Sequence, residues 1–234
     1  MCGRFGRIGE GNWLDKDWSH EIENLETLGF GFNTYNAAPK QLQVVITSSK
    51  PSQFQCFLWG LIPRDSASAQ PKYPYFNAKA ETLLKIYPWN RIFPKQRCLI
   101  PAHFFYEWPK LDGKTKTGQP PYFFGLKGNR SFSFAGIWDA WLDPLSQGYQ
   151  PSFTLITTEP NSVLRPYHNR MPVILTGINE EIWMNKESKL EELEMVLRPY
   201  DPDQMVHYPV SPLVGNIRNN EPALIKKIAW PDSN

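Results

Sequence analysis

The 234 residues include 22 prolines, and this feature restricts the fold more than any other. This proline content is about twice the average usage of roughly 5%. Proline breaks helix interiors and is poorly tolerated in central strands, so the chain is unsuited to a helical bundle and favours short strands joined by turns. Hydrophobic residues make up 41% of the sequence, which is enough for a sizeable core. The length suits one large domain or two small ones.

Hydrophobic patterning predicts more strands than helices. The predicted strands cover residues 42–47, 54–58, 97–100, 103–108, 122–126, 132–138 and 152–158. Pro101 separates the third from the fourth, and a hairpin across Lys127-Gly128-Asn129-Arg130 joins the fifth to the sixth. Helices are predicted at 17–28, with Gly29 as C-cap, and near 187–197, ended by Pro199. Strands and helices do not alternate regularly, which predicts an α+β fold with antiparallel sheets.

Composition excludes several classes of protein. No apolar run approaches the roughly 18 residues of a membrane span, and the N-terminus lacks the pattern of a signal peptide. We therefore expect a soluble, intracellular protein that does not contact membranes. Cys2, Cys56 and Cys98 are an odd number without CxxC spacing, so neither a disulfide framework nor a zinc site is expected. The net charge of +2 neither requires nor excludes a nucleic-acid partner.

Cys2 is the residue with the most specific chemistry. If Met1 is removed, the α-amine and the thiol of Cys2 lie on adjacent carbons. An aldehyde can then condense with the amine to a Schiff base, and the thiol can close on the same carbon to give a thiazolidine ring. The alternative is that Cys2 is an ordinary small hydrophobic residue.

Such a reaction needs a neutral amine and a group that moves protons. Glu107, between aromatic residues in Phe-Phe-Tyr-Glu-Trp, has surroundings that raise a carboxyl pKa, although an outward-facing position on the strand explains it equally well. His168 precedes an apolar run and is a second candidate, with an ordinary surface or core role as the alternative. Asn77 could orient the cysteine, or could be a helix cap or turn residue. Asn36 has the same alternative.

Arg4, Lys79 and Arg170 lie in or beside these motifs and could hold successive phosphates. The nearby Phe5, Trp59 and Phe76 could stack on bases, although core packing explains them too. The sequence contains no glycine-rich phosphate loop and no HExxH or GxSxG motif.

Together, these segments resemble the SOS response-associated peptidase family, whose members are also described as abasic-site processing proteins. The matching segments are MCGRF at 1–5, YNAAP at 35–39, WGLIP at 59–63, NAKAET at 77–82, RCLIPAHFFYEW at 97–108, FAGIW at 134–138, FTLITTEPN at 153–161, HNRMPVIL at 168–175 and VSPLVGNIRNN at 210–220. Their order across most of the chain is what makes the resemblance specific.

No linker divides the chain, so we expect one domain at 1–230 and a tail at 231–234. The resemblance implies that this domain is compact, with a β-rich, barrel-like core and flanking helices. It implies that Cys2, exposed by loss of Met1, captures the ring-opened sugar of an abasic site in single-stranded DNA and shields the lesion in the DNA damage response. Asn77, Glu107 and His168 are the implied catalytic partners. The implied DNA contacts are Arg4, Asn36, Pro39, Lys79 and Arg170. No cofactor or metal is implied, and we expect a monomer in the cytoplasm, on the nucleoid of a bacterium or in the nucleus of a eukaryote.

The chain departs from the family pattern at four positions. Lys79 stands where the family often has Arg and Asp65 where a second Trp is usual, while Phe104 replaces a common Gly and Asn169 a common Asp. These changes leave the expected catalytic set intact and bear on the DNA groove. Two other functions stay open: a thiol autopeptidase that uses Cys2, and a non-covalent reader of modified DNA bases.

Overall fold

The computed structural model describes residues 2–9, 12–13, 16–17, 25, 31–69, 75–111, 114–115 and 118–230. Within these ranges the chain is mostly strand, and its longest helix, α3 (Ile178–Met184), has seven residues. Proline stands in the first turn of three 3₁₀ helices, namely η3 (Pro202–Gln204), η4 (Pro212–Gly215) and η5 (Pro222–Ile225). Its fixed φ suits that position, and its missing N–H is not needed there. The predicted β-rich α+β fold with short elements is confirmed.

Five strands of the larger sheet close into a barrel, as expected. In order around the ring they are β14 (Tyr149–Thr158), β6 (Lys50–Trp59), β5 (Leu42–Thr47), β8 (Arg97–Ala102) and β13 (Phe132–Leu142), which pairs again with β14. Three short strands extend the sheet: β7 (Asn77–Lys79), β15 (Met171–Pro172) and β16 (Ile174–Leu175). The pairings of β14 with β6 and β7 are parallel, whereas the other pairings among the described strands are antiparallel.

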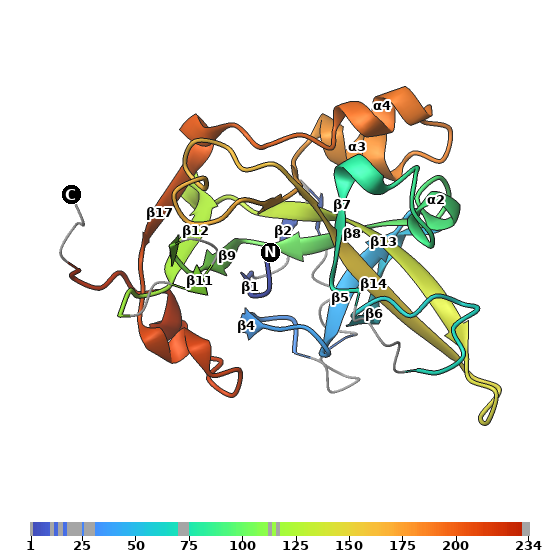
Figure 1. Ribbon diagram of the computed structural model, residues 1–234, viewed down its shortest axis with the longest axis horizontal. Coiled ribbons are helices and arrows are strands. Elements are labelled where there is room, and N and C mark those ends of the chain that lie inside the picture. Colours follow the sequence, from blue (N-terminus) through green and yellow to red (C-terminus); the bar gives the residue numbers. More distant parts are fainter. Residues whose placement is uncertain are drawn as a thin grey trace.

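A second sheet of five strands lies beside the barrel (Figure 1). Its order is β17 (Met205–Pro209), β12 (Tyr122–Leu126), β9 (Phe104–Glu107), β1 (Phe5–Arg7) and β4 (Thr34–Ala37). The first strand of the chain, β1, is therefore an interior strand that pairs with β4 on one side and β9 on the other. This pairing carries the residues just before β1 into the middle of the molecule.

A cluster of aromatic side chains holds β1 against the barrel. Phe5 is fully buried, and its ring lies 5.3 Å from that of Trp59 and 5.6 Å from that of Phe134. Burying a side chain of this size stabilises a fold by about 1.5–3 kcal/mol. Cys2 belongs to the same buried cluster. The N-terminal segment is therefore anchored by the burial of Phe5, three residues after Cys2, and does not fray.

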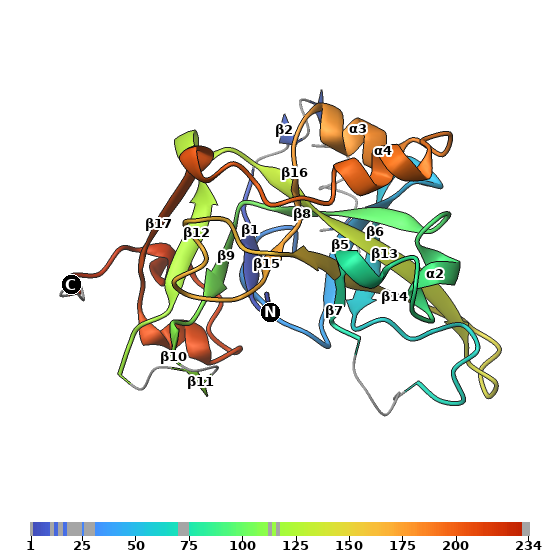
Figure 2. The same ribbon diagram turned by 45° about the horizontal axis from the view of Figure 1, so that its top comes forward.

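The helices cover one end of the barrel. Figure 2 shows α3 and α4 (Leu190–Met195) side by side above β16 and β8, with α2 (Trp89–Ile92) further along. The indole N–H of Trp183 donates to the carbonyl of Cys98 (3.0 Å), and Arg97 donates to the carbonyl of Trp183 (2.7 Å). The helix predicted near 187–197 is confirmed as α4. The helix predicted at 17–28 lies almost entirely outside the described residues.

Two sequence-based predictions about strands are wrong. Residues 122–126 and 132–138 do form strands, but β12 pairs with β9 and β17 whereas β13 belongs to the barrel, so they make no hairpin. The connection η2 (Lys127–Asn129) passes from one sheet to the other. Pro101 lies inside β8 instead of ending it. Because β5 pairs with β8 only at Leu99 and Cys98, a residue without an N–H is tolerated beyond that pairing.

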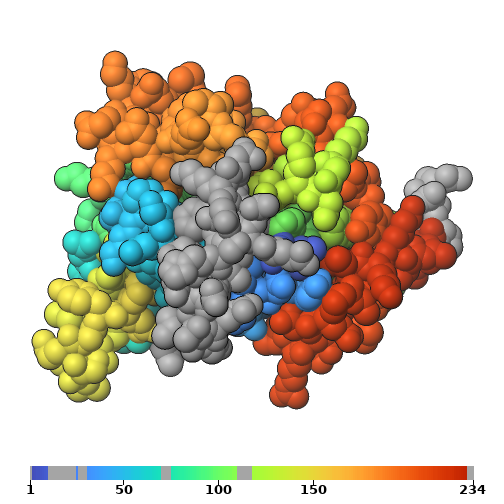
Figure 3. Space-filling view, turned by 180° about the vertical axis from the view of Figure 1, so that it is seen from behind, coloured from blue at the N-terminus to red at the C-terminus, as the bar shows by residue number. Residues whose placement is uncertain are grey.

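The remaining short elements lie at the periphery: η1 (Ala80–Thr82), and the strand pairs β2 (Asn12–Trp13) with β3 (Lys16–Asp17) and β10 (Lys110–Leu111) with β11 (Lys114–Thr115). After β17 the chain packs against the outer face of the second sheet, where Val210, Val214 and Leu224 contact a cluster around Phe104 and Tyr106. Seen from behind, this C-terminal segment and the β13–β14 turn lie at opposite ends of the molecule (Figure 3). The tail expected at 231–234 lies outside the described residues. Among those that are described, no helix is long and apolar enough to cross a membrane.

Candidate functional site

Cys2 is fully buried and its backbone is held by Asn77. The side-chain Nδ2 of Asn77 donates to the Cys2 carbonyl oxygen (3.1 Å), and the Cys2 thiol lies 3.9 Å from the carbonyl oxygen of Arg4. Asn77 begins β7, which β14 holds by parallel pairing opposite Leu155. The Asn77 Oδ1 atom is buried and accepts no hydrogen bond from the described residues. An acceptor is thus available directly beside Cys2.

Glu107 faces Cys2 because side chains alternate along β9. Phe104 and Tyr106 point to the outer cluster, whereas Phe105 packs in the cluster that contains Cys2. Glu107 shares the parity of Phe105 and is only 3% exposed, so the outward-facing alternative for this residue is wrong. Burial of the thiol, together with the nearby Glu107 carboxylate, raises the pKa of Cys2 well above its usual value. The thiol therefore carries its proton at neutral pH.

His168 is buried in the connection between β14 and β15. Its Nδ1 accepts a hydrogen bond from the backbone N–H of Arg170 (2.9 Å), and the backbone N–H of His168 donates to the carbonyl of Leu164 (3.0 Å). Because Nδ1 is an acceptor, the neutral imidazole carries its proton on Nε2. Leu164 and Met171, on either side of His168, belong to the buried cluster of Cys2. The ring is thus fixed in one tautomer as a donor.

The cations expected at phosphates differ in how they are engaged. Lys79 is exposed at the end of β7. Arg170 is mostly buried, with both guanidinium ends bound to the two carboxylate oxygens of Glu81 (2.7 and 2.9 Å). It also donates to the carbonyl of Thr157. The hydrogen bonds from Arg170 lower the pKa of Glu81, so this ion pair is present at neutral pH.

Arg4 and Asn36 hold the segment around η4 rather than reaching into solvent. Arg4 donates to the Asn36 Oδ1 atom (3.0 Å) and to the carbonyls of Val214 (2.7 Å) and Gly215 (3.2 Å). The Nδ2 atom of Asn36 lies 3.1, 3.0 and 2.9 Å from the carbonyl oxygens of Val214, Asn216 and Asn219. The Asn36 side chain is only 2% exposed, and its hydrogen bonds go to the segment around η4.

The sequence motif at 210–220 indicated that this segment matters, but not that Arg4 and Asn36 are its partners. Partial burial lowers the pKa of Arg4, which nevertheless stays cationic at neutral pH because arginine is so basic. Pro39 is half-buried at the turn that follows β4.

Three of the four departures from the family pattern, Phe104, Asn169 and Asp65, have different surroundings. Phe104 covers Gly6, its cross-strand partner, so closely that a Cβ on Gly6 would lie 2.0 Å from the ring. Phe104 belongs to the outer cluster and leaves the Cys2 side of the sheet unchanged. Asn169 is exposed. Asp65 takes part in a polar network with Tyr87 and Arg91.

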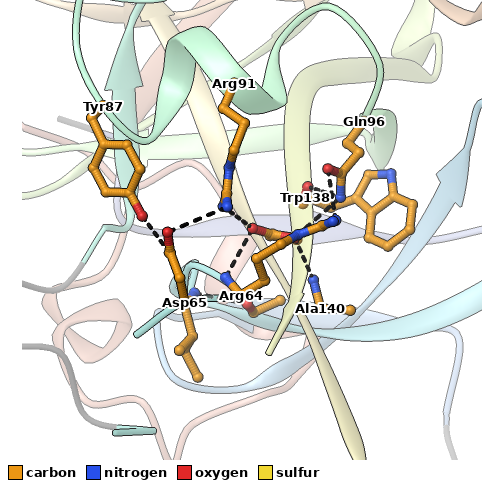
Figure 4. Close-up of polar contacts among 10 residues, drawn as sticks. Arg64, Asp65, Tyr87, Arg91, Gln96, Trp138 and Ala140 are labelled. Carbon is orange, nitrogen blue, oxygen red and sulfur yellow. Dashed lines mark hydrogen bonds and ion pairs between the residues drawn. The ribbon is translucent and has the colours of Figure 1, made fainter. Parts of the chain in front are cut away.

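That network surrounds the fully buried carboxylate of Asp139 (Figure 4). Its Oδ1 accepts from Arg64 Nε (3.0 Å), Gln96 Nε2 (3.2 Å) and the Ala140 N–H (2.9 Å). Its Oδ2 accepts from the Arg64 N–H (2.9 Å) and Arg91 Nη2 (2.7 Å).

Asp65 joins the network through Arg91 (3.4 Å) and the Tyr87 hydroxyl. Its negative charge is therefore matched by Arg91 within the protein. These contacts tie the loop after β6 to α2 and β13.

The other two cysteines have no partner for a disulfide. Cys98 is buried and Cys56 half-buried, both are free thiols, and burial raises the pKa of each. Within the described part of the chain, no three His, Cys, Asp or Glu side chains gather in a way that could hold a metal ion.

Comparison with known proteins gives consistent matches over most of the chain. Abasic site processing protein YoqW of Bacillus subtilis is 37% identical over 228 residues, covering 97% of this chain and 99% of the relative. Abasic site processing protein HMCES of Xenopus tropicalis is 26% identical, covering 83% of this chain and 66% of the relative. A crystal structure of a protein from Bacteroides thetaiotaomicron superposes with a TM-score of 0.78 at 27% identity, covering 89% of this chain and 91% of that one.

The model of one protein family, described as SOS response associated peptidase (SRAP), matches residues 1–217. This confirms the resemblance drawn from the sequence motifs, and the chain belongs to the SRAP family.

Proposed function

We propose that this protein processes abasic sites in single-stranded DNA by forming a covalent crosslink through Cys2 after Met1 is removed. The observation that carries the proposal is the setting of Cys2, fully buried between the amide of Asn77 and the carboxylate of Glu107. Relatives named abasic site processing proteins, matched over nearly the whole chain, support the same substrate.

The chemistry needs only groups that this site and the lesion supply. The neutral α-amine of Cys2 attacks the aldehyde carbon of the ring-opened sugar and forms a carbinolamine. Loss of one water gives the protonated imine. The Cys2 sulfur then adds to the imine carbon, the thiol proton is released to a base, and a thiazolidine results. The raised thiol pKa supports this order, in which the amine attacks first and the thiol closes the ring.

The surrounding side chains have separate roles in this scheme. Asn77 fixes the Cys2 backbone, and its unoccupied Oδ1 accepts a hydrogen bond from the new α-amine. Glu107 takes the amine proton and returns it to the departing water. His168, whose Nδ1 accepts the Arg170 N–H, offers its Nε2–H as a hydrogen-bond donor to the sugar oxygen and assists ring opening without giving up that proton.

DNA binding uses the cations near this site. Lys79, at the end of β7, and Arg170 contact phosphates, and Arg4 and Pro39 are further contacts of the strand. Asn36 acts indirectly because it positions Arg4 and the segment around η4. Contacts of this type fix the strand without selecting its sequence.

Intact-mass measurement before and after mixing with abasic single-stranded DNA tests the proposal. The expected product has the mass of the protein without Met1 plus the oligonucleotide minus one water. Cys2→Ser keeps the α-amine, so it should give only an imine that needs chemical reduction to survive denaturation. A heat-stable adduct formed by Cys2→Ser, or by protein that retains Met1, would overturn the thiazolidine mechanism.

A peptidase that uses Cys2 is the alternative, and its nearest substrate is the Met1–Cys2 bond. A cysteine peptidase needs a thiolate, which burial and Glu107 disfavour here. The two functions differ in stoichiometry. Crosslinking consumes one site per molecule, whereas a peptidase turns over many peptide molecules, so measuring product per protein with excess peptide separates them.

A further inference from the structure

An aromatic pocket that the proposed reaction does not use lies between β12, β17 and the C-terminal segment. Its volume is about 540 Å³. The residues that line it are Tyr122, Tyr167, His207, Tyr208, Pro209, Lys227, Ile228, Ala229 and Trp230. Four of these side chains are aromatic rings other than histidine, and Lys227 supplies one exposed cation.

The inner wall of the pocket is continuous with the Cys2 site. Tyr122 is the cross-strand partner of Glu107, and Tyr167 directly precedes His168. Both tyrosines pack against the buried cluster that contains Cys2, and their rings lie 4.6 Å apart. A strand of DNA whose lesion reaches Cys2 therefore passes within reach of this pocket.

The walls are held in place before any ligand arrives. The His207 ring stacks on Phe124 at 5.7 Å with an interplanar angle of 8°. Burial lowers the pKa of His207, which keeps the ring neutral and suited to stacking at neutral pH. The outer rim is fixed to β17 because the Ile228 N–H donates to the Pro209 carbonyl (3.0 Å) and Lys227 pairs with Val210.

We propose that this pocket binds one unpaired nucleobase of the strand that carries the lesion, stacked on its aromatic rings, with Lys227 at the adjoining phosphate. The inference rests on the proposed function only for the identity of the strand. Aromatic rings beside a cation are the combination with which proteins bind single-stranded DNA without sequence preference, because every base has a face that stacks. The pocket would thereby set the register of the strand relative to Cys2.

Non-covalent binding of undamaged oligonucleotides, followed by fluorescence anisotropy, tests this inference without the crosslinking reaction. Trp230→Ala should weaken binding about 5- to 150-fold, the range measured for loss of one stacked base, and Trp230→Phe should restore most of it. Lys227→Ala should make the slope of log K against log salt shallower by the amount expected for the loss of about one phosphate contact. Tyr149→Ala is the matched control, since this aromatic residue is 73% exposed at the start of β14. The β13–β14 turn beside it lies at the opposite end of the molecule from the C-terminal segment (Figure 3).

A scan of base deletions locates the contact. One base at a time is replaced by a baseless spacer along the oligonucleotide, and the loss of affinity is compared between the unmodified protein and Trp230→Ala. We expect one position at which the unmodified protein loses affinity and the variant does not. Equal profiles for both proteins, or a Trp230→Ala affinity equal to that of Tyr149→Ala, would overturn the inference.

The outcomes separate this inference from the proposed function. If the unmodified protein forms no stable adduct with abasic DNA but Trp230 couples to one base, the crosslinking proposal fails and the pocket stands. If the adduct forms and no base couples to Trp230, the pocket proposal fails alone.

Discussion

Replacing the buried carboxylate of Asp139 by an amide tests the polar network of Figure 4. Asp139 is the acceptor in all five of its hydrogen bonds, so the NH₂ group of an asparagine at this position must face some of the donors. With the NH₂ in place of Oδ1 it faces three donors. In place of Oδ2 it faces two, the Arg64 N–H and Arg91 Nη2, and this is the less costly orientation.

The expected loss follows from those two contacts. A hydrogen bond to a charged group contributes about 1.5–3 kcal/mol, and breaking a buried ion pair costs about 3–5 kcal/mol. The Arg91 side chain is 35% exposed, so it can return to water and recover part of the loss. We therefore expect Asp139→Asn to lower the free energy of unfolding by about 3 kcal/mol, the lower end of that range.

Urea unfolding at pH 7, followed by far-ultraviolet circular dichroism, measures the change. Asp65→Asn is the matched control, because Asp65 contacts the same Arg91 but is 53% exposed, and its loss should stay below about 1 kcal/mol. A value for Asp139→Asn under about 1 kcal/mol would show that the five contacts do not hold the loop after β6 to α2, and the reasoning would fail.

Three further changes probe the site and the fold. Glu107→Gln should slow adduct formation about 100-fold with little change in DNA affinity; a rate within threefold of the unmodified protein would exclude proton transfer by Glu107. Glu81→Gln removes the carboxylate that competes with phosphate for Arg170 and should steepen the slope of log K against log salt for DNA binding by up to roughly 0.7, whereas Glu159→Gln, at an exposed acid, should leave the slope unchanged. Burial and Arg7 lower the pKa of His103 from 6.5 to about 4. As the pH falls, His103 is therefore protonated in the unfolded chain before it is protonated in the folded protein, and about 3 kcal/mol of stability should be lost between pH 6.5 and 4. The free energy of unfolding of His103→Gln, measured over the same range, should depend less on pH.

Strand positions could be predicted from the sequence because they depend on local patterns. The run at 42–47 is rich in β-branched residues, with Val44, Val45 and Ile46 at its centre, and forms β5 with the predicted bounds. Strand pairing could not be predicted in the same way. Residues 122–126 and 132–138 look like a hairpin because a glycine-containing turn joins them, yet the two strands pair in different sheets. Tertiary packing decides which strands pair, and the composition of the connecting turn does not reveal that packing.

In the candidate site, the residue types could likewise be predicted from the sequence, whereas their contact partners could not. The chemistry of Cys2, Asn77 and Glu107 indicated that they act together, and the structure brings Asn77 and Glu107 to Cys2 from β7 and β9. The bonds between Arg4 and Val214 could not be predicted, since 210 residues separate the two. The pairing of Arg170 with Glu81 was likewise hidden, because an arginine in a motif looks the same whether it binds phosphate or carboxylate.

These distant partners explain how a residue at position 2 can serve a reaction that requires fixed geometry. Chain ends usually fray, and a strand of three residues has few hydrogen bonds of its own. Here β1 pairs on both sides, Phe5 is buried against the barrel, and Asn77 holds the Cys2 carbonyl. Arg4 adds a fourth attachment, to the segment around η4. The order of the N-terminus is thus supplied by the rest of the fold, and it leaves the α-amine as the only part of Cys2 that removal of Met1 must change.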